Sequence, residues 1–455
     1  MSEKRVSSGV PAGRLLLGAG LAGAIFFGVS ALLLTVVWGG AKLFGLDGPV
    51  GQGLLNLAAT ALILVMITAT LLTIAERKWS AAIQNRVGPN RARLFKGQRH
   101  ALFGIPHILA DTLKMLSKED FVPMKGTKLF FNLAPILAFA PAFALVAVLP
   151  IGPSVEAFGV KVGLQIADLD MGLLYIFAVA SIAIYGTALA GWASNNKFAL
   201  MGGLRASAQM ISYEVTLALT LVGALLLYGT LRPLEIATWQ DATFWGLVPR
   251  WGIFFQPVAF VFFLVAAAAE IKRAPFDLPE GESEIVGYFV EYSGMKFGLF
   301  MIAEFVEVVV LAGLVTVVFF GGWSIPWLPY DALIAQLSAA GLGPDWGGLL
   351  AGLLAIFAFV TKMMFFVWLQ MMVRWTFPRF RYDQVMDLGW KMLLPLSLAN
   401  VVLTAALIAW DPTLQWAMAV GLIETFALFI VAASVAAPDR EEELARVQRA
   451  GGRAA

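Results

Sequence analysis

The sequence predicts an all-α fold, a polytopic membrane helix bundle of about ten transmembrane helices with one further helix at the interface. Apolar residues make up 60% of the 455 residues and charged residues only 14%, whereas ordinary soluble domains carry about 25% charged residues. Apolar runs of roughly 20 residues, long enough to cross a bilayer of about 30 Å, recur along the chain. Its mean hydropathy is +0.81.

The apolar runs define the individual spans. The first run is too long for the apolar core of a signal peptide, so we interpret it as a membrane helix. The short polar segments at 151–169 and 230–250 look like connectors. The approximate limits of the spans are 17–45, 53–75, 129–150, 171–192, 208–229, 252–271, 297–320, 348–373, 390–410 and 414–436.

Lysine and arginine are distributed unevenly between the two sides that these spans define. One side carries eleven basic residues between Arg77 and Lys128 alone. The other side holds only Lys42, Lys161, Arg232 and Arg250. Because basic residues accumulate in cytoplasmic loops, this asymmetry predicts that both termini are cytoplasmic.

The segment from Glu76 to Lys128 is too polar to span a membrane and too apolar for a simple loop. Ile105, Leu109 and Leu113 recur at helical spacing, while Asp111 lies on another face. This pattern predicts an amphipathic helix lying in the membrane interface. On pattern alone, a plain surface anchor fits it equally well.

The stretch from Glu270 to Glu307 contains eight carboxylates in an otherwise lipid-like chain. A carboxylate at the bilayer centre costs roughly 2.5–3.5 kcal/mol, so the group requires water, pairing or a proton-handling role. Carboxylates this close raise one another's pKa and titrate as a group. The members are Glu270, Asp277, Glu280, Glu282, Glu284, Glu291, Glu304 and Glu307.

Several classes of site are excluded by residue content. The chain has no cysteine and only two histidines, His100 and His107, in one segment. It therefore holds no thiolate zinc site, all-cysteine iron–sulfur cluster or bis-histidine haem. No nucleotide fingerprint or Gly-rich phosphate loop is visible. We therefore expect that this chain binds no metal and no nucleic acid. Any redox centres would lie on partner subunits.

Four polar segments carry long motifs that resemble the complex I subunit 1 family, which forms the quinone chamber of bacterial and mitochondrial NADH–quinone oxidoreductases. The motifs read AERK (75–78) with QNRVGPNR (84–91), GWASNNK (191–197) with LRASAQ (204–209) and SYEV (212–215), RAPFDLPEGESE (273–284) with EYSGMKF (291–297), and PRFRYDQ (378–384). The resemblance covers about 53–411, an eight-helix core. Residues 1–52 and 412–455 each add a helix and a polar tail.

This resemblance implies a role for the chain in a proton-pumping NADH–quinone oxidoreductase of the bacterial plasma membrane. Its partners would be soluble quinone-site subunits, antiporter-like membrane subunits, the lipid bilayer and a quinone substrate, ubiquinone or menaquinone. Residues implied in the quinone chamber are Glu76, Arg77, Arg86 and, on the interfacial helix, Asp111. Residues implied in the acidic proton-coupling path are Glu214, Glu270, Glu280, Glu282, Glu284 and Glu304, completed by Lys362.

Other interpretations remain open for single residues. Glu214 could be a structural carboxylate that is hydrogen-bonded by Arg205 or Tyr213. Glu270 could form an ion pair with Lys272 or Arg273. Glu307 fits a structural role as well as a coupling role. Lys362 fits a relay or a static pair with one of the glutamates.

Two other functions are open for the whole chain. A homologous subunit of a membrane-bound hydrogenase-type ion pump would share these motifs without binding quinone. A proton-coupled secondary transporter would also use buried carboxylates, but the absence of a visible inverted repeat argues against it.

Overall fold

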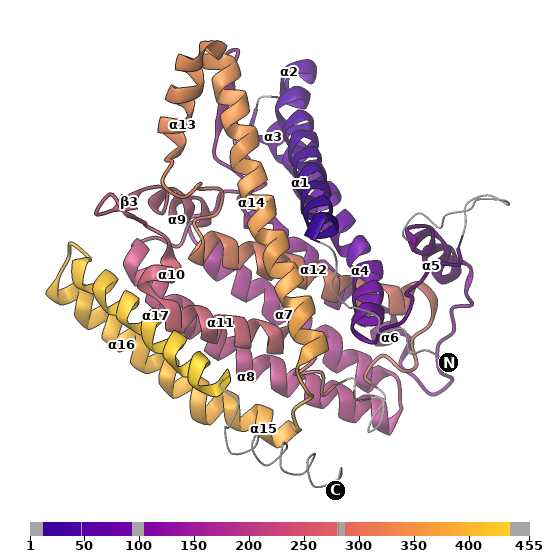
Figure 1. Ribbon diagram of the computed structural model, residues 1–455. Coiled ribbons are helices and arrows are strands. Elements are labelled where there is room, and N and C mark those ends of the chain that lie inside the picture. The colour runs from indigo at the N-terminus through magenta and orange to yellow at the C-terminus, as the bar shows by residue number, and fades with distance from the viewer. Residues whose placement is uncertain (1–11, 47, 93–103, 280, 282–286, 437–455) are drawn as a thin grey trace, which may run out of the picture.

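A computed structural model describes residues 12–46, 48–92, 104–279, 281 and 287–436 of the chain. Within these residues, nine helices are long and apolar enough to cross a membrane, and Pro257–Glu270 is a shorter apolar helix. The predicted all-α membrane bundle is confirmed (Figure 1). Helices suit this environment because each satisfies its own backbone hydrogen bonds without water.

The described helices follow one another along the chain, with connections of very different lengths. They are α1 (Ala12–Leu34), η1 (Thr35–Gly39), α2 (Gly40–Phe44), α3 (Pro49–Asn56), η2 (Leu57–Met66), α4 (Ile67–Ile83), α5 (Pro106–Ser117), α6 (Lys128–Ala144), η4 (Leu145–Val148), α7 (Gly172–Ala193), α8 (Lys197–Tyr228), α9 (Pro233–Trp239), α10 (Gly252–Phe255), α11 (Pro257–Glu270), α12 (Gly294–Phe319), α13 (Tyr330–Leu337), η5 (Ser338–Leu342), α14 (Gly343–Thr376), α15 (Tyr382–Asp387), η6 (Leu388–Leu393), α16 (Leu394–Trp410) and α17 (Gln415–Ala436).

Helix α12 forms the centre of the bundle. Almost every side chain from Phe305 to Phe319 is buried, and α12 contacts α4, α6 and α14. Helix α7 packs between α6 and α8, and α11 and α16 pack beside α8. Figure 1 shows α14 running the length of the molecule, with α16 and α17 on one flank.

The two ends of the bundle differ in charge. Helices α4, α11 and α14 finish at one end, which carries Arg77, Arg273 and Arg374. We call this the basic end and the other the opposite end. Helices α4 and α8 extend further toward the basic end than their apolar runs predict, so Glu76 and Arg205 lie on helices.

The predicted span at 252–271 is wrong as a single helix, because the chain breaks at Gln256 between α10 and α11. Pro257 follows the break and has no backbone N–H to continue the helix. The Gln256 side chain accepts a hydrogen bond from Asn400 at 2.7 Å and donates one to Thr404 at 2.6 Å. Helix α16 therefore satisfies the polar side chain that lies at the break.

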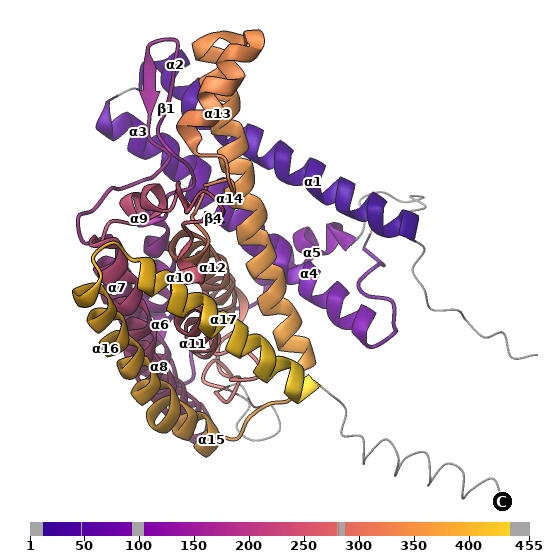
Figure 2. The ribbon, with the colours of Figure 1, turned by 60° about the vertical axis from the view of Figure 1, so that its left-hand side comes forward.

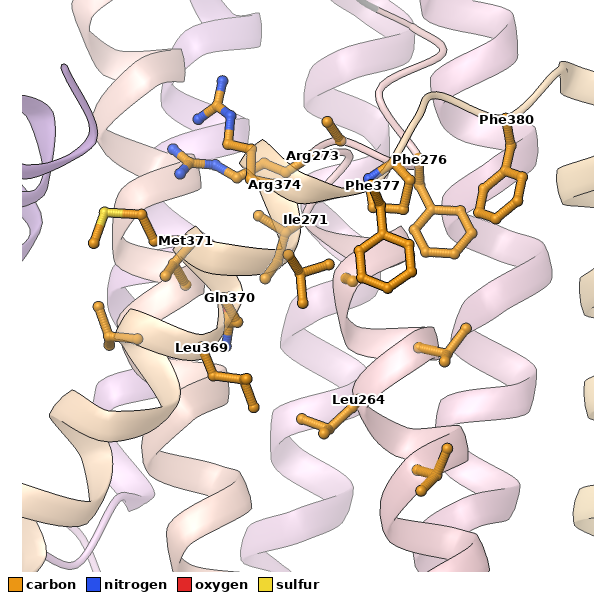
Figure 3. A pocket seen from close by; sticks show the side chains of 18 of the residues that line it. Leu264, Ile271, Arg273, Phe276, Leu369, Gln370, Met371, Arg374, Phe377 and Phe380 are labelled. Carbon is orange, nitrogen blue, oxygen red and sulfur yellow. The ribbon is translucent and has the colours of Figure 1, made fainter. Parts of the chain in front are cut away.

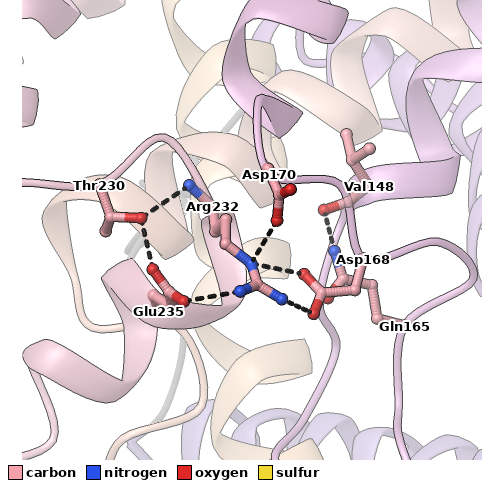
Figure 4. A network of polar contacts seen from close by, with 7 residues as sticks. All are labelled: Val148, Gln165, Asp168, Asp170, Thr230, Arg232 and Glu235. Atoms are coloured by element: carbon pink, nitrogen blue, oxygen red, sulfur yellow. Dashed lines mark hydrogen bonds and ion pairs between the residues drawn. The ribbon is translucent and has the colours of Figure 1, made fainter.

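The segments predicted as plain connectors contain structure at the opposite end. Two short antiparallel hairpins form there, Val155–Ala157 with Val160–Val162 and Thr243–Phe244 with Val248–Pro249. Arg232, just before α9, bonds Asp168 and Glu235 and lies 3.7 Å from Asp170 (Figure 4). This arginine ties the 165–170 segment to α9.

The terminal helices lie at the periphery. Helix α1 packs on α14 and η2 and extends away from the other helices (Figure 2). Helix α17 packs on α10, α11 and α16, and Gly421 allows its backbone to lie close to Phe254. Glu424, on the same helix, is half-buried.

Candidate functional site

A buried ion cluster lies at the basic end. Glu76, at the middle of α4, is only 8% exposed. One of its carboxylate oxygens accepts a hydrogen bond from Arg374 of α14 at 2.6 Å, and the other accepts one from Arg273. The Arg273 guanidinium also lies 4.3 Å from the ring centre of Phe305. We call Glu76, Arg273 and Arg374 the Glu76 cluster.

The Glu76 cluster forms part of the wall of a cavity of about 530 Å³. It is the larger of the two cavities that this cluster lines, and we call it the large cavity. Arg77 and Arg86, which the resemblance implies in the quinone chamber, line this cavity, and so does Glu304 of α12. The remaining described lining residues are mainly aromatic or small, namely Thr73, Ser80, Pro89, Phe289, Phe297, Phe300, Met301, Phe305 and Trp375. The cavity therefore combines charged groups with apolar surface.

Asp111 supports this cavity without lining it. It accepts hydrogen bonds from Arg77 at 2.7 Å and from Lys114 at 3.1 Å. Partial burial raises the pKa of Asp111, but the bonds from Lys114 and Arg77 outweigh this effect and hold it below its usual value. Helix α5, which carries Asp111, packs against α4 and α12. Asp111 thus connects α5 to α4 through Arg77.

The predicted interfacial helix is present as α5, which begins at Pro106. Leu109, Leu113 and Leu116 are all more than half exposed along one side of it. An exposed leucine row is what an interfacial helix presents to lipid. The earlier part of the predicted segment, with His100, falls within 93–103, outside the described residues.

A second cavity of about 380 Å³ lies between α11 and α14 and is lined almost entirely by apolar side chains. Figure 3 shows Arg273 and Arg374 at one end of it, with Leu264 and Leu369 further along the helices. Glu76 lines this cavity as well as the first one. The Glu76 cluster therefore separates a polar cavity from an apolar one.

Two of the sequence motifs meet beside this apolar cavity. Arg379 donates to Asp277 at 2.8 Å, and the backbone N–H of Phe380 donates to Pro275 at 3.1 Å. Burial raises the pKa of Asp277, and the Arg379 guanidinium offsets only part of that increase. The position of Arg379 in a short polar loop suggests docking of another protein. In the structure it joins the RAPFD and PRFRYDQ segments of the chain itself.

A third, much smaller cavity of about 30 Å³ lies deeper in the bundle. It is lined by Glu214 of α8, Glu270 at the end of α11 and Glu307 of α12, among apolar residues. One oxygen of Glu270 and one of Glu307 have no hydrogen-bond partner among the described residues. The structure therefore brings Glu214 and Glu270 together, and adds Glu307.

The contacts of neighbouring side chains narrow the structural roles that the sequence left open for single glutamates. The Tyr213 hydroxyl donates to the carbonyl of Val385 at 2.8 Å, so it is engaged away from Glu214. Arg273 is bound to Glu76 rather than to Glu270. Glu304 accepts a 3.3 Å hydrogen bond from Tyr288. Glu280, Glu282 and Glu284 lie outside the described residues.

Lys362 lies apart from the glutamates. Its ammonium donates to the carbonyls of Phe320, Gly322 and Ser324 at 2.8, 3.1 and 2.6 Å, and lies 4.3 Å from the Trp251 ring centre. Phe320 follows Glu307 by 13 residues, which is about 20 Å along a helix. In the described part of the chain, Lys362 thus binds the end of α12 instead of a glutamate, against the predicted pairing.

Sequence reasoning missed Arg374 and undervalued Arg273 as site residues. Both bind Glu76 and line two cavities. Arg273 stands in the RAPFD motif, which gave a signal for it. Arg374 gave none, because a basic residue at the end of a membrane helix is usually an interfacial anchor.

The described architecture is that of a multi-pass membrane protein with a charged cavity at one end of the helix bundle and buried carboxylates deeper in the bundle. The family sequence model for NADH dehydrogenase matches residues 55–405. An H-type chain of the NADH-quinone oxidoreductase of Geobacter metallireducens is 45% identical over 77% of this chain and 95% of its own length. The H-type chain of the same enzyme from Geobacillus kaustophilus is 42% identical over 85% of this chain and 95% of its own length.

The chain belongs to this family, the H-type subunits of NADH-quinone oxidoreductase. It is accordingly a membrane subunit of that enzyme complex, and the family membership predicted from the four motifs is confirmed. Helices α1 and α17 lie outside the matched residues.

Proposed function

We propose that this chain forms the membrane wall of the quinone site in a proton-translocating NADH–quinone oxidoreductase, and transmits quinone reduction to proton movement in the membrane. The observation that carries the proposal is the 530 Å³ cavity lined by Arg77, Arg86 and Glu304. Quinones have an apolar tail and a weakly polar head. The aromatic residues of the cavity suit the tail, and its charged residues suit the path of the head.

The basic end would face the cytoplasm. This follows from the positive-inside asymmetry of the loops and places the cavity where soluble partner subunits can complete it. Those subunits would carry the redox centres, while antiporter-like membrane subunits would pack against the bundle. The membrane would be the bacterial plasma membrane, and the substrate ubiquinone or menaquinone.

The buried glutamates would couple quinone reduction to proton movement. Glu304 lines the large cavity, whereas Glu214 and Glu270 line the small one deeper in the bundle. Glu280, Glu282 and Glu284 would complete the acidic path in the loop between α11 and α12. Changes in charge at the quinone would alter which of these carboxyl groups hold protons.

Photo-crosslinking tests the quinone assignment. The assembled complex would be illuminated with an azido-quinone and digested, and the labelled peptides identified by mass spectrometry. We expect label in peptides containing Arg77, Arg86 or Phe297, removed by excess unlabelled quinone. The 151–169 segment at the opposite end serves as the internal control. Label spread equally over that segment, or insensitive to competition, would overturn the proposal.

A further inference from the structure

Helix α12 contributes carboxyl groups to two different cavities. Glu304 lines the large cavity at the basic end, and Glu307 lines the small cavity that also contains Glu214 and Glu270. Residues three positions apart lie on neighbouring parts of one helix face, with about 5–6 Å between their Cβ atoms. One turn of α12 therefore separates a carboxyl group of one cavity from a carboxyl group of the other.

The environment of Glu307 indicates a ligand. The residue is only 8% exposed, and its second carboxylate oxygen has no partner among the described residues. A buried carboxylate oxygen without a hydrogen-bond donor is unfavourable. The cavity of about 30 Å³ that it lines exceeds the roughly 10–15 Å³ that a single water requires. Water, or a proton shared with a neighbouring carboxyl group, fits this position.

Charge balance in the small cavity favours shared protons. Lys272 is 3% exposed, and its ammonium lies 3.8 Å from the sulfur of Met210, which also lines the cavity. Three ionised carboxylates beside one ammonium in a water-poor site would be costly. A group of this kind holds protons collectively, and a proton can move between its members with little net change in charge.

We infer that Glu307 is a proton-transfer residue that connects Glu304 in the large cavity with Glu214 and Glu270 in the small one. The inference rests on the proposed function and adds a link to its acidic path. In each step an O–H bond of a protonated carboxyl breaks, and a new O–H bond forms on a water or the next carboxylate. No electron moves in these steps, so no oxidant or reductant is needed.

The test uses the complete complex reconstituted in lipid vesicles. Glu307→Gln keeps the size of the side chain but cannot relay a proton through an ionised state. We expect proton uptake driven by NADH oxidation to fall at least about tenfold, since positioned proton-transfer groups typically contribute factors of 10² or more. Glu307→Asp, which retains the carboxyl group, should restore most of the uptake.

A matched control and a direct readout separate transfer from structure. Glu424→Gln removes another carboxyl group from a membrane helix, the peripheral α17, and should leave uptake unchanged. Infrared difference spectra between oxidised and NADH-reduced complex should contain a protonated-carboxyl band that Glu307→Asp shifts. Absence of that shift would overturn the inference, including when Glu307→Gln fails to assemble.

The outcomes also distinguish this inference from the proposed function. Loss of proton uptake in Glu304→Gln and Glu270→Gln, with normal uptake in Glu307→Gln, would refute the role of Glu307 and leave the acidic path intact. Normal uptake in all three variants would refute the path itself. Loss in all three, with rescue by Glu307→Asp, supports both.

Discussion

Basic residues are used differently at the two ends of this bundle. At the basic end, two arginines share one carboxylate in the Glu76 cluster, where the Arg273 and Glu76 side chains are 12% and 10% exposed. At the opposite end, one arginine, Arg232, forms ion pairs with three carboxylates, of which the Asp170 side chain is 91% exposed. One cluster is buried with an excess of positive charge, and the other lies in the open with an excess of negative charge.

Ion pairs with similar distances therefore have different consequences in the two places. Water screens the opposite-end cluster, so it can fasten loops without strongly affecting the core. The Glu76 cluster lies between two cavities, where charge is weakly screened. Its three residues come from different parts of the chain, α4, the loop after α11 and α14. It can therefore fix the shape of the proposed quinone site.

The largest effect is expected from Glu76→Gln. The variant leaves Arg273 and Arg374 facing each other without their shared anion, and breaking a buried pair typically costs about 3–5 kcal/mol. We expect less assembled complex to survive heating, and NADH–quinone turnover to fall sharply. Glu76→Asp, which keeps the charge on a shorter side chain, is the matched control and should be less damaged. Equal heat stability of Glu76→Gln and the wild type would contradict the comparison.

Lys362→Met should have the next largest effect. The Lys362 ammonium supplies hydrogen bonds to the carbonyls of Phe320, Gly322 and Ser324 at the end of α12, and a buried carbonyl left without a donor costs about 1–3 kcal/mol. We expect a lower thermal transition of the complex, with turnover retained below that transition. Lost turnover with unchanged heat stability would instead assign Lys362 to proton transfer.

Arg232→Ala should have a smaller effect, because its ion pairs are exposed to solvent. We expect a slight decrease in the Tm of the complex at low salt, disappearing at high salt as the pairs are screened. Proton uptake and turnover should remain at wild-type values. A loss of turnover, or a Tm decrease as large as that of Glu76→Gln, would show that the Arg232 ion pairs do more than hold the loops of the opposite end together.

The bundle is predictable from sequence for a simple physical reason. A membrane helix needs about 20 apolar residues, so run length and basic-residue asymmetry reveal the spans directly. The break at Gln256 is not predictable in this way, because its hydrogen-bond partner Asn400 is 144 residues away. The apolar run continues through the break, and only the fold reveals that α16 supplies the hydrogen-bond partners of the Gln256 side chain.

The candidate site, too, is predictable only in part from the sequence. Glu76, Arg77 and Arg86 stand in recognisable motifs, and all three line the large cavity. Arg374, the second partner of Glu76, is 298 residues away from it and looks like an ordinary interfacial anchor in the sequence. Lys362 carries a strong sequence signal, a charge within an apolar span, but that signal does not specify its partner. The choice between carbonyls and carboxylates depends on where the end of α12 lies.

The smallest effect is expected from Asp111→Asn, which tests how firmly α5 is fastened to the basic end. Asp111 has a pKa below the usual value because Lys114 and Arg77 outweigh its partial burial. A carboxyl group with a lowered folded-state pKa contributes stability above its unfolded pKa of about 3.9, and this contribution is lost as the pH falls through the folded pKa. In the wild type, protection of α5 amides from hydrogen exchange should therefore decrease at acidic pH. In Asp111→Asn the protection should be lower at neutral pH and change less with acidification. Identical pH profiles would mean that packing on α4 and α12, rather than the Arg77–Asp111 pair, holds α5 against the cavity.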